Sequence, residues 1–183
     1  VELGHNLSSK AIVHPSKIFG DQRRNSKGWD ITDPVTVAEI DEGRNRYKSH
    51  QWKGGPVLAV DSVSDEVVEV RNPANPDDLV GHITYTSEAD ISSALDAAQD
   101  GFKQWSAVPA EERAAMIRRV GDLYEENVHE LFALTTREAG KSLLDAVAEI
   151  REAGDFAMFY ANEGIRDKND GEGRGRTLYT PDA

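Results

Sequence analysis

The residues at 139–142 are of types that can bind a phosphate group. Ala139-Gly140-Lys141-Ser142 matches the end of a P-loop, in which backbone N–H groups and a lysine hold the phosphates of a nucleotide. The complete pattern requires a glycine five positions before Gly140, where this chain has Thr135. Because a helical pattern and not a strand precedes the motif, we interpret Gly140 as the residue that ends a helix.

Other reactive side chains are present without the spacing that their chemistry needs. The five histidines lack the spacing of a zinc-binding helix, and no serine stands in a G-x-S-x-G turn. Residues 171–175 contain G-x-G without the rest of the dinucleotide-binding pattern, and we predict a loop there. The acidic pairs Glu111-Glu112 and Glu125-Glu126 are predicted on solvated helix faces. The residues alone therefore assign no metal site, nucleophile or acid–base pair.

Composition narrows the classes of function. The formal net charge of −12 argues against a surface that binds nucleic acid, because such a surface must displace cations from phosphates. The chain contains no cysteine, so it holds neither a disulfide nor a thiolate nucleophile. We find no secretory signal pattern and no apolar run of about 20 residues, and we expect a cytoplasmic protein.

Periodicity divides the chain into two parts. Residues 1–55 are interrupted by proline and glycine, and apart from a helix predicted over 36–47 we interpret them as a linker or interdomain segment. Three β-type runs follow at 56–60, 67–70 and 79–85, with turn residues between them. This spacing predicts short antiparallel strands. A further short strand is predicted at 177–180.

Four amphipathic helices are predicted between residues 87 and 164. Ser87 and Asp90 form a capping pattern for the first helix, and Pro109 is expected to open the second. The third is predicted over 128–138 and the fourth from about 142 to 162, with Gly154 at a close helix crossing. The fold class is therefore mostly α with a small antiparallel β element. Wide apolar faces near residues 156–160 indicate that more protein is needed to cover the helices.

The chain from about residue 56 to 183 resembles the N-terminal part of the aldehyde dehydrogenase superfamily. The resemblance rests on the order and spacing of short motifs, which are Val70-Arg71-Asn72-Pro73-Ala74, Val80-Gly81, Trp105, Pro109-Ala-Glu-Glu-Arg113, the helix 117–126, Thr136-Arg137-Glu138-Ala139-Gly140-Lys141, Ala148-Glu149-Ile150 and Phe159-Tyr160. Residues 23–30 also resemble the connecting segment of the bifunctional proline utilization A family, in which a proline dehydrogenase that uses FAD precedes an NAD-dependent dehydrogenase.

This resemblance implies a fold, an activity and partners. Residues 56–183 would be the N-terminal strands and helical layer of an α/β aldehyde dehydrogenase fold without its Rossmann sheet. The parent enzyme would oxidise L-glutamate γ-semialdehyde, the open form of 1-pyrroline-5-carboxylate, to glutamate with NAD in proline catabolism. Its partners would be the remainder of its own polypeptide and a small-molecule substrate, with no nucleic acid, in a homo-oligomer. A stand-alone dehydrogenase and a self-contained acidic interaction module without catalysis are the alternatives.

The family mechanism needs a cysteine thiolate that attacks the aldehyde, an asparagine amide that helps to hold the oxyanion, and a sheet that carries NAD. All three are expected after Ala183, so we expect no catalytic residue and no bound cofactor in this chain, which would be inactive alone.

One residue of the chain is a candidate for a place near the chemistry. The resemblance places Glu149 on a helix that borders the substrate tunnel, and the alternative is a surface glutamate bonded to Arg151 or to a neighbouring segment. Arg24 and Asn25 are expected to hold the linker against the domain. Glu138 and Lys141 are expected to make contacts at helix ends.

Overall fold

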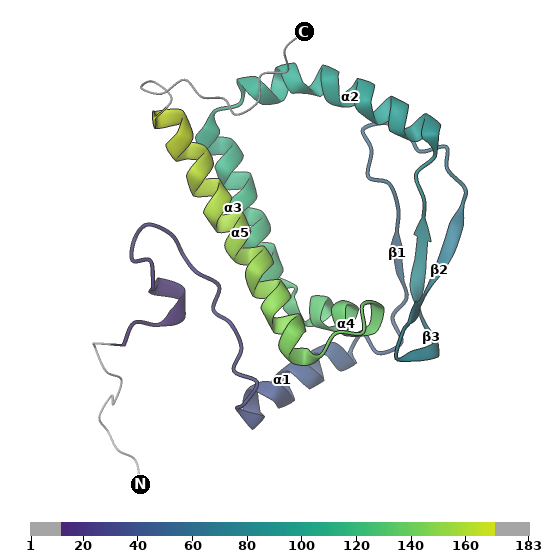
Figure 1. Ribbon diagram of the computed structural model, residues 1–183, viewed down its shortest axis with the longest axis vertical. Coiled ribbons are helices and arrows are strands. Elements are labelled where there is room, and N and C mark those ends of the chain that lie inside the picture. The colour runs from purple at the N-terminus through teal and green to yellow at the C-terminus, as the bar shows by residue number, and fades with distance from the viewer. Residues whose placement is uncertain (1–11, 171–183) are drawn as a thin grey trace.

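The computed structural model describes residues 12–170, and the side chains up to residue 166. The loop predicted at 171–175 and the strand predicted at 177–180 lie outside the described residues. Figure 1 shows the elements, which in chain order are the 3-10 helix η1 (Pro15–Lys17), α1 (Pro34–Asn45), β1 (Trp52–Gly54), β2 (Val67–Asn72), β3 (Asn75–Thr84), α2 (Glu88–Ala107), α3 (Ala110–Glu126), α4 (Val128–Glu138) and α5 (Leu143–Asp170). The prediction of a mostly helical chain with a small sheet is confirmed.

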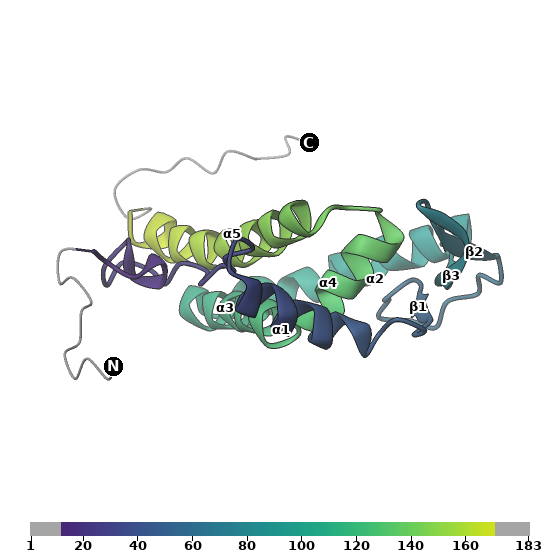
Figure 2. The same cartoon turned by 90° about the horizontal axis from the view of Figure 1, so that it is seen from below.

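The helices form two packed groups, α3 with α5 and α1 with α4. Helices α3 and α5 lie side by side along their length, and α4 with α1 packs near the start of α5 (Figure 1). The sheet lies at the opposite end of the molecule from η1 when the structure is seen from below (Figure 2). In the described part of the chain, the backbone of α2 lies close to no other helix or strand, and near its end Trp105 lies 5.9 Å from the guanidinium of Arg113 on α3. No helix within residues 12–170 is long and apolar enough to cross a membrane.

The best-packed core lies where α1, α4 and α5 meet. Its buried apolar side chains are Ile40, Val128, Phe132, Ala146, Val147 and Ile150. Trp29, from the segment before α1, packs edge-on against Phe132 with ring centroids 5.3 Å apart. Asp33 caps α1 by accepting from the backbone N–H of Val35 and Thr36, and Pro34 follows as the first helical residue. The helix predicted at 36–47 is therefore present and begins two residues earlier.

Helices α3 and α5 approach closely at a glycine of α3. A Cβ atom added at Gly121 would lie 2.8 Å from Cε of Met158 and 3.4 Å from the carbonyl oxygen of Gly154. A Cβ atom at Gly154 would meet no atom within 4 Å. The close crossing predicted at Gly154 is thus present, but Gly121 is the residue that permits it.

The sheet is mixed, with strand order β1-β3-β2. β2 and β3 form the predicted antiparallel hairpin, whereas β1 pairs in parallel with residues 81–83 of β3. The strand predicted at 56–60 is wrong, because Pro56 lacks a backbone donor and Val57 is 99% exposed without a partner strand. The sheet takes Trp52–Gly54 instead, three residues that precede the predicted boundary at residue 55.

The start of α2 carries the predicted capping box. The Ser87 hydroxyl accepts from the backbone N–H of Asp90, and the Asp90 carboxylate accepts from the backbone N–H of Ser87. Asp90 is only 1% exposed and also accepts from the backbone N–H of Val63 and the hydroxyl of Ser62. These donors, with the N–H of Val63 first, lower the pKa of Asp90 to about 2. The side chain therefore ties the loop before β2 to the beginning of α2.

Candidate functional site

The candidate residue Glu149 lies on an early turn of α5 and is half exposed. Its Oε1 accepts a hydrogen bond from Nζ of Lys141 at 2.5 Å, and this carboxylate raises the pKa of the lysine. Arg151 is not its partner, because residues two apart on a helix point in different directions, and the Arg151 guanidinium lies against Gly28. Lys141 thus makes a contact near a helix end, as predicted, and Glu149 pairs with a neighbouring segment.

Lys141 stands in the turn between α4 and α5, where Gly140 ends α4. Gly140 has a φ of +62°, in the left-handed region that glycine adopts at little cost. A Cβ atom there would lie 2.8 Å from Cγ of Pro73. Ser142 then caps α5, since its hydroxyl accepts from the backbone N–H of Asp145. The P-loop-like residues 139–142 therefore end one helix and begin the next, as interpreted from the sequence.

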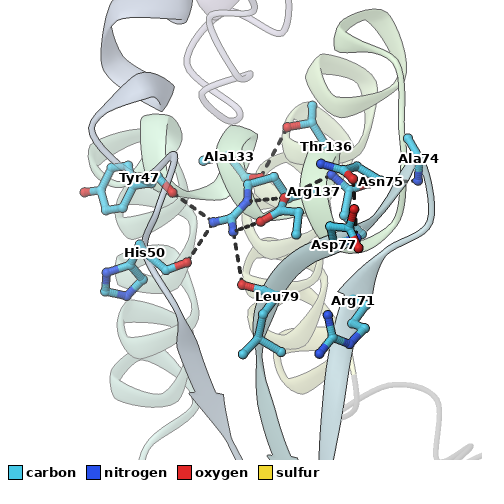
Figure 3. A network of polar contacts seen from close by, with 12 residues as sticks. Tyr47, His50, Arg71, Ala74, Asn75, Asp77, Leu79, Ala133, Thr136 and Arg137 are labelled. Atoms are coloured by element: carbon cyan, nitrogen blue, oxygen red, sulfur yellow. Dashed lines mark hydrogen bonds and ion pairs between the residues drawn. The ribbon is translucent and has the colours of Figure 1, made fainter.

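Arg137, at the end of α4, holds this turn against the sheet (Figure 3). Its guanidinium donates to both carboxylate oxygens of Asp78, at 2.6 and 3.1 Å. The same group donates to the carbonyl oxygens of Tyr47, His50 and Leu79, at 2.9, 2.8 and 3.3 Å. Arg137 is 11% exposed, so these are mostly buried, charge-assisted bonds that join α4 to β3 and to the turn after α1.

Side chains from the sheet complete this network. Arg137 holds the pKa of the Asp78 carboxyl below its usual value, and the amide of Asn72 adds to the effect with a 3.1 Å hydrogen bond. The guanidinium of Arg137 also lies 5.2 Å from the ring centroid of Trp52, whose indole N–H donates to Glu130 at 2.9 Å. Two motifs that are far apart in the sequence, residues 70–74 and 136–141, are therefore parts of one contact region.

The segment 22–27, which we call the strap, lies along α3 and α5. Asp155 of α5 accepts from the backbone N–H and the hydroxyl of Ser26, at 2.7 and 3.2 Å. Turning the Asn25 amide over places its nitrogen 2.9 and 3.0 Å from the two oxygens of Asp155. Asn25 and Ser26 are each only 5% exposed. Asp155 is therefore the main anchor of the strap.

Charged groups of α3 add to this attachment. Arg24 donates to Asp122 at 2.6 Å, and Glu125 accepts from the backbone N–H of Lys27 at 3.2 Å. The expectation that Arg24 and Asn25 face the domain thus agrees with these contacts. The prediction that Glu125 is a solvated charge is wrong, because the strap covers it. Glu126 is exposed and pairs with Arg119.

Sequence reasoning found Glu149, Lys141, Arg24 and Asn25 but missed the acids that organise the region. Asp78 bonds Arg137 across 59 positions, and Asp155 bonds Ser26 across 129 positions. No local pattern contains pairs at such separations.

The described residues do not suit a nucleotide cofactor or a metal. β3 leads into α2 through Tyr85, Thr86 and Ser87, without the glycines that a dinucleotide site needs between a strand and a helix. Within residues 12–170, no group of three or more His, Asp or Glu side chains is arranged to hold a metal ion.

Comparisons with known proteins identify the family of this chain. The profile of the Aldehyde dehydrogenase family matches residues 59–179. Bifunctional protein PutA of Klebsiella aerogenes is 35% identical over 166 residues, which is 91% of this chain and 13% of that protein. The 1-pyrroline-5-carboxylate dehydrogenase of Bacillus licheniformis is 31% identical over 81% of this chain and 32% of that protein.

A solved structure shows the same fold. The 1-pyrroline-5-carboxylate dehydrogenase from Thermus with bound NAD superposes with a TM-score of 0.70, at 27% identity, over 78% of this chain and 28% of that one. The chain thus spans about an eighth of the bifunctional relative and about a third of the stand-alone ones. Because the family profile covers well over half of its residues, the chain belongs to the aldehyde dehydrogenase family.

Proposed function

We propose that this chain is the entry segment and first helical layer of a dehydrogenase that oxidises L-glutamate γ-semialdehyde to glutamate with NAD. The observation that carries the proposal is the extent of the similarity to PutA. The family profile begins at residue 59, whereas the PutA match takes in 91% of the chain and so includes most of the residues before it. The strap lies in that earlier part. The stand-alone dehydrogenase of Bacillus licheniformis matches less of the chain at lower identity, with 31% over 81% against 35% over 91% for PutA. This difference supports a bifunctional parent, in which a proline dehydrogenase that uses FAD precedes the chain.

The chain alone is proposed to be inactive, and α2 supplies a structural reason. Apart from the contact of Trp105 with Arg113 of α3, the described residues leave its apolar face uncovered. Its large side chains are 45–66% exposed, namely Ile91, Leu95, Phe102 and Trp105. A monomer seldom leaves so long an apolar face in water. We propose that the remainder of the same polypeptide covers it and brings the thiolate and the nucleotide-binding sheet. A cytoplasmic homo-oligomer is part of the same proposal.

The residues of this chain would then position the parts of the active site and would take no part in the chemical step. Arg137 and Gly140 fix the turn between α4 and α5. This turn sets where α5 begins, and so it sets the position of Glu149 beside the substrate passage. The carboxylate of Glu149 would order water or shape that passage. Since the described residues do not fit NAD, hydride transfer is assigned to groups outside them.

The reading frame around this chain tests the proposal directly. We expect it to continue after residue 183 into a Rossmann strand, followed much later by a cysteine nucleophile. A natural stop codon directly after Ala183 would contradict the proposal.

The role of Glu149 needs kinetics of the complete polypeptide. Glu149→Ala should lower the rate of semialdehyde oxidation, whereas Glu126→Ala, an equally exposed glutamate of α3, should not. Unchanged kinetics of the Glu149 variant would remove it from the site.

A further inference from the structure

Lys141 lies beside two carboxylates of α5. Its ammonium group donates to Glu149, and Asp145, one turn earlier on the same helix, adds to the rise in its pKa. Lys141 is therefore a permanent cation at neutral pH. It is 33% exposed and Glu149 is 50% exposed, so one side of the pair is open. Among the described residues, Glu149 accepts only one of the three N–H donors that an ammonium group has.

The position of this cation is fixed by the backbone before it. Gly140 turns in the left-handed region against Pro73, and Arg137 holds the preceding helix end to Asp78. Ser142 caps α5 directly afterwards. The ammonium group thus starts from a short segment that is held on both sides. A substrate that reaches Glu149 meets a cation whose place is set by the fold.

The charge of the substrate makes this cation matter. Glutamate semialdehyde carries a carboxylate, and a carboxylate that approaches Glu149 and Asp145 is repelled by both. We propose that Lys141 is a specificity-determining residue, which offsets this repulsion and favours aldehydes that bear a carboxylate. The inference rests on the proposed function and on the place of Glu149 in the substrate passage. Two unit charges about 6 Å apart near a protein surface interact strongly enough to change an affinity tenfold or more.

The test compares an anionic and a neutral aldehyde in the complete dehydrogenase. Lys141→Met should raise the KM for glutamate semialdehyde about tenfold and leave the KM for butanal, a neutral aldehyde, unchanged. Values of kcat should change by less than about twofold, because the cation acts on approach and not on the reacting carbon. Lys141→Arg keeps the charge and should restore most of the affinity.

Arg119→Met is the matched control, since it also removes an exposed ion pair, with Glu126 at 2.5 Å on α3. It should change neither KM. Equal increases of both KM values in Lys141→Met would show a structural role and overturn the inference, as would an unchanged KM for the semialdehyde. If the wild-type enzyme fails to oxidise the semialdehyde, the proposed function itself fails. If Glu149→Ala has no effect, the substrate does not pass Glu149 and the inference about Lys141 is overturned while the proposed function stands.

Discussion

The guanidinium of Arg137 holds both oxygens of the Asp78 carboxylate, at 2.6 and 3.1 Å, across the junction of helix α4 and strand β3. The same guanidinium donates to three backbone carbonyls, those of Tyr47, His50 and Leu79. The pair therefore sets how the sheet sits on the helical layer and, through Gly140, where α5 begins.

Replacing Arg137 should destabilise the dehydrogenase by roughly 2–4 kcal/mol, because Asp78 and the carbonyls lose their donors together. Lysine should rescue little, since it cannot bond in the same fork. Urea unfolding of Arg137→Met and Arg137→Lys measures this. Arg71→Met, which breaks a half-exposed pair with Glu69, should cost under about 1 kcal/mol. Equal losses for Arg71→Met and Arg137→Met would contradict the role of Arg137.

Gly140→Ala should lower stability by about 1–2 kcal/mol or more. The left-handed φ of +62° disfavours alanine, and the new Cβ would lie 2.8 Å from Pro73. Gly101→Ala is the matched control in α2, where a Cβ meets no atom within 4 Å and should stabilise the helix by about 0.5–1 kcal/mol. Thermal unfolding compares the two. A stabilising Gly140→Ala would mean that the turn does not have this conformation.

The two glycines at the crossing of α3 and α5 should respond differently. Gly154→Ala should be neutral or stabilising by up to about 1 kcal/mol, because its Cβ has open space. Gly121→Leu should be strongly destabilising, since even a Cβ there lies 2.8 Å from Met158. Denaturant midpoints of the two variants provide the measurement. The opposite order would place the close approach at Gly154.

The carboxylate of Asp90 should make the folding stability depend on pH in the acidic range. Its pKa is about 2 in the folded chain against an ordinary 3.8, so its contribution to stability is complete above about pH 5 and is lost as the pH falls toward 2. Asp90→Asn should therefore be destabilised at neutral pH, and its difference from the wild type should shrink between pH 5 and pH 2.5. Unfolding curves at several pH values test this. A difference that stays constant over that range would rule out a carboxylate held ionised by its donors.

Asp155→Ala should release the strap without unfolding α3 and α5. The backbone N–H of Ser26 loses its acceptor, so its hydrogen exchange should accelerate while amides of α5 keep their protection. Asp122→Ala removes only the exposed pair with Arg24 and should have a smaller effect. Exchange measured by mass spectrometry resolves the two regions. Protection at Ser26 that survives in Asp155→Ala would assign the anchor elsewhere.

The local signals in the sequence predicted the helices well. Ser87 with Asp90, the 128–138 pattern and Gly140 all act within a few residues, and each is present in the structure. The sheet was harder, because the apolar run at 56–60 has strand composition but no partner, whereas Trp52–Gly54 pairs with a strand 29 positions away. The contacts of Asp78 and Asp155 could not be predicted from the sequence for the same reason, since each depends on a fold that joins distant segments.

Oxidation of glutamate semialdehyde, followed as NADH formation, tests the central claim most directly. Three samples are needed, namely the complete polypeptide, the same polypeptide without residues 87–166, and the isolated 183-residue chain. We predict turnover by the complete polypeptide only, because the helical layer supports a site whose reacting groups lie outside it. Turnover by the isolated chain, or full activity after the deletion, would contradict the claim.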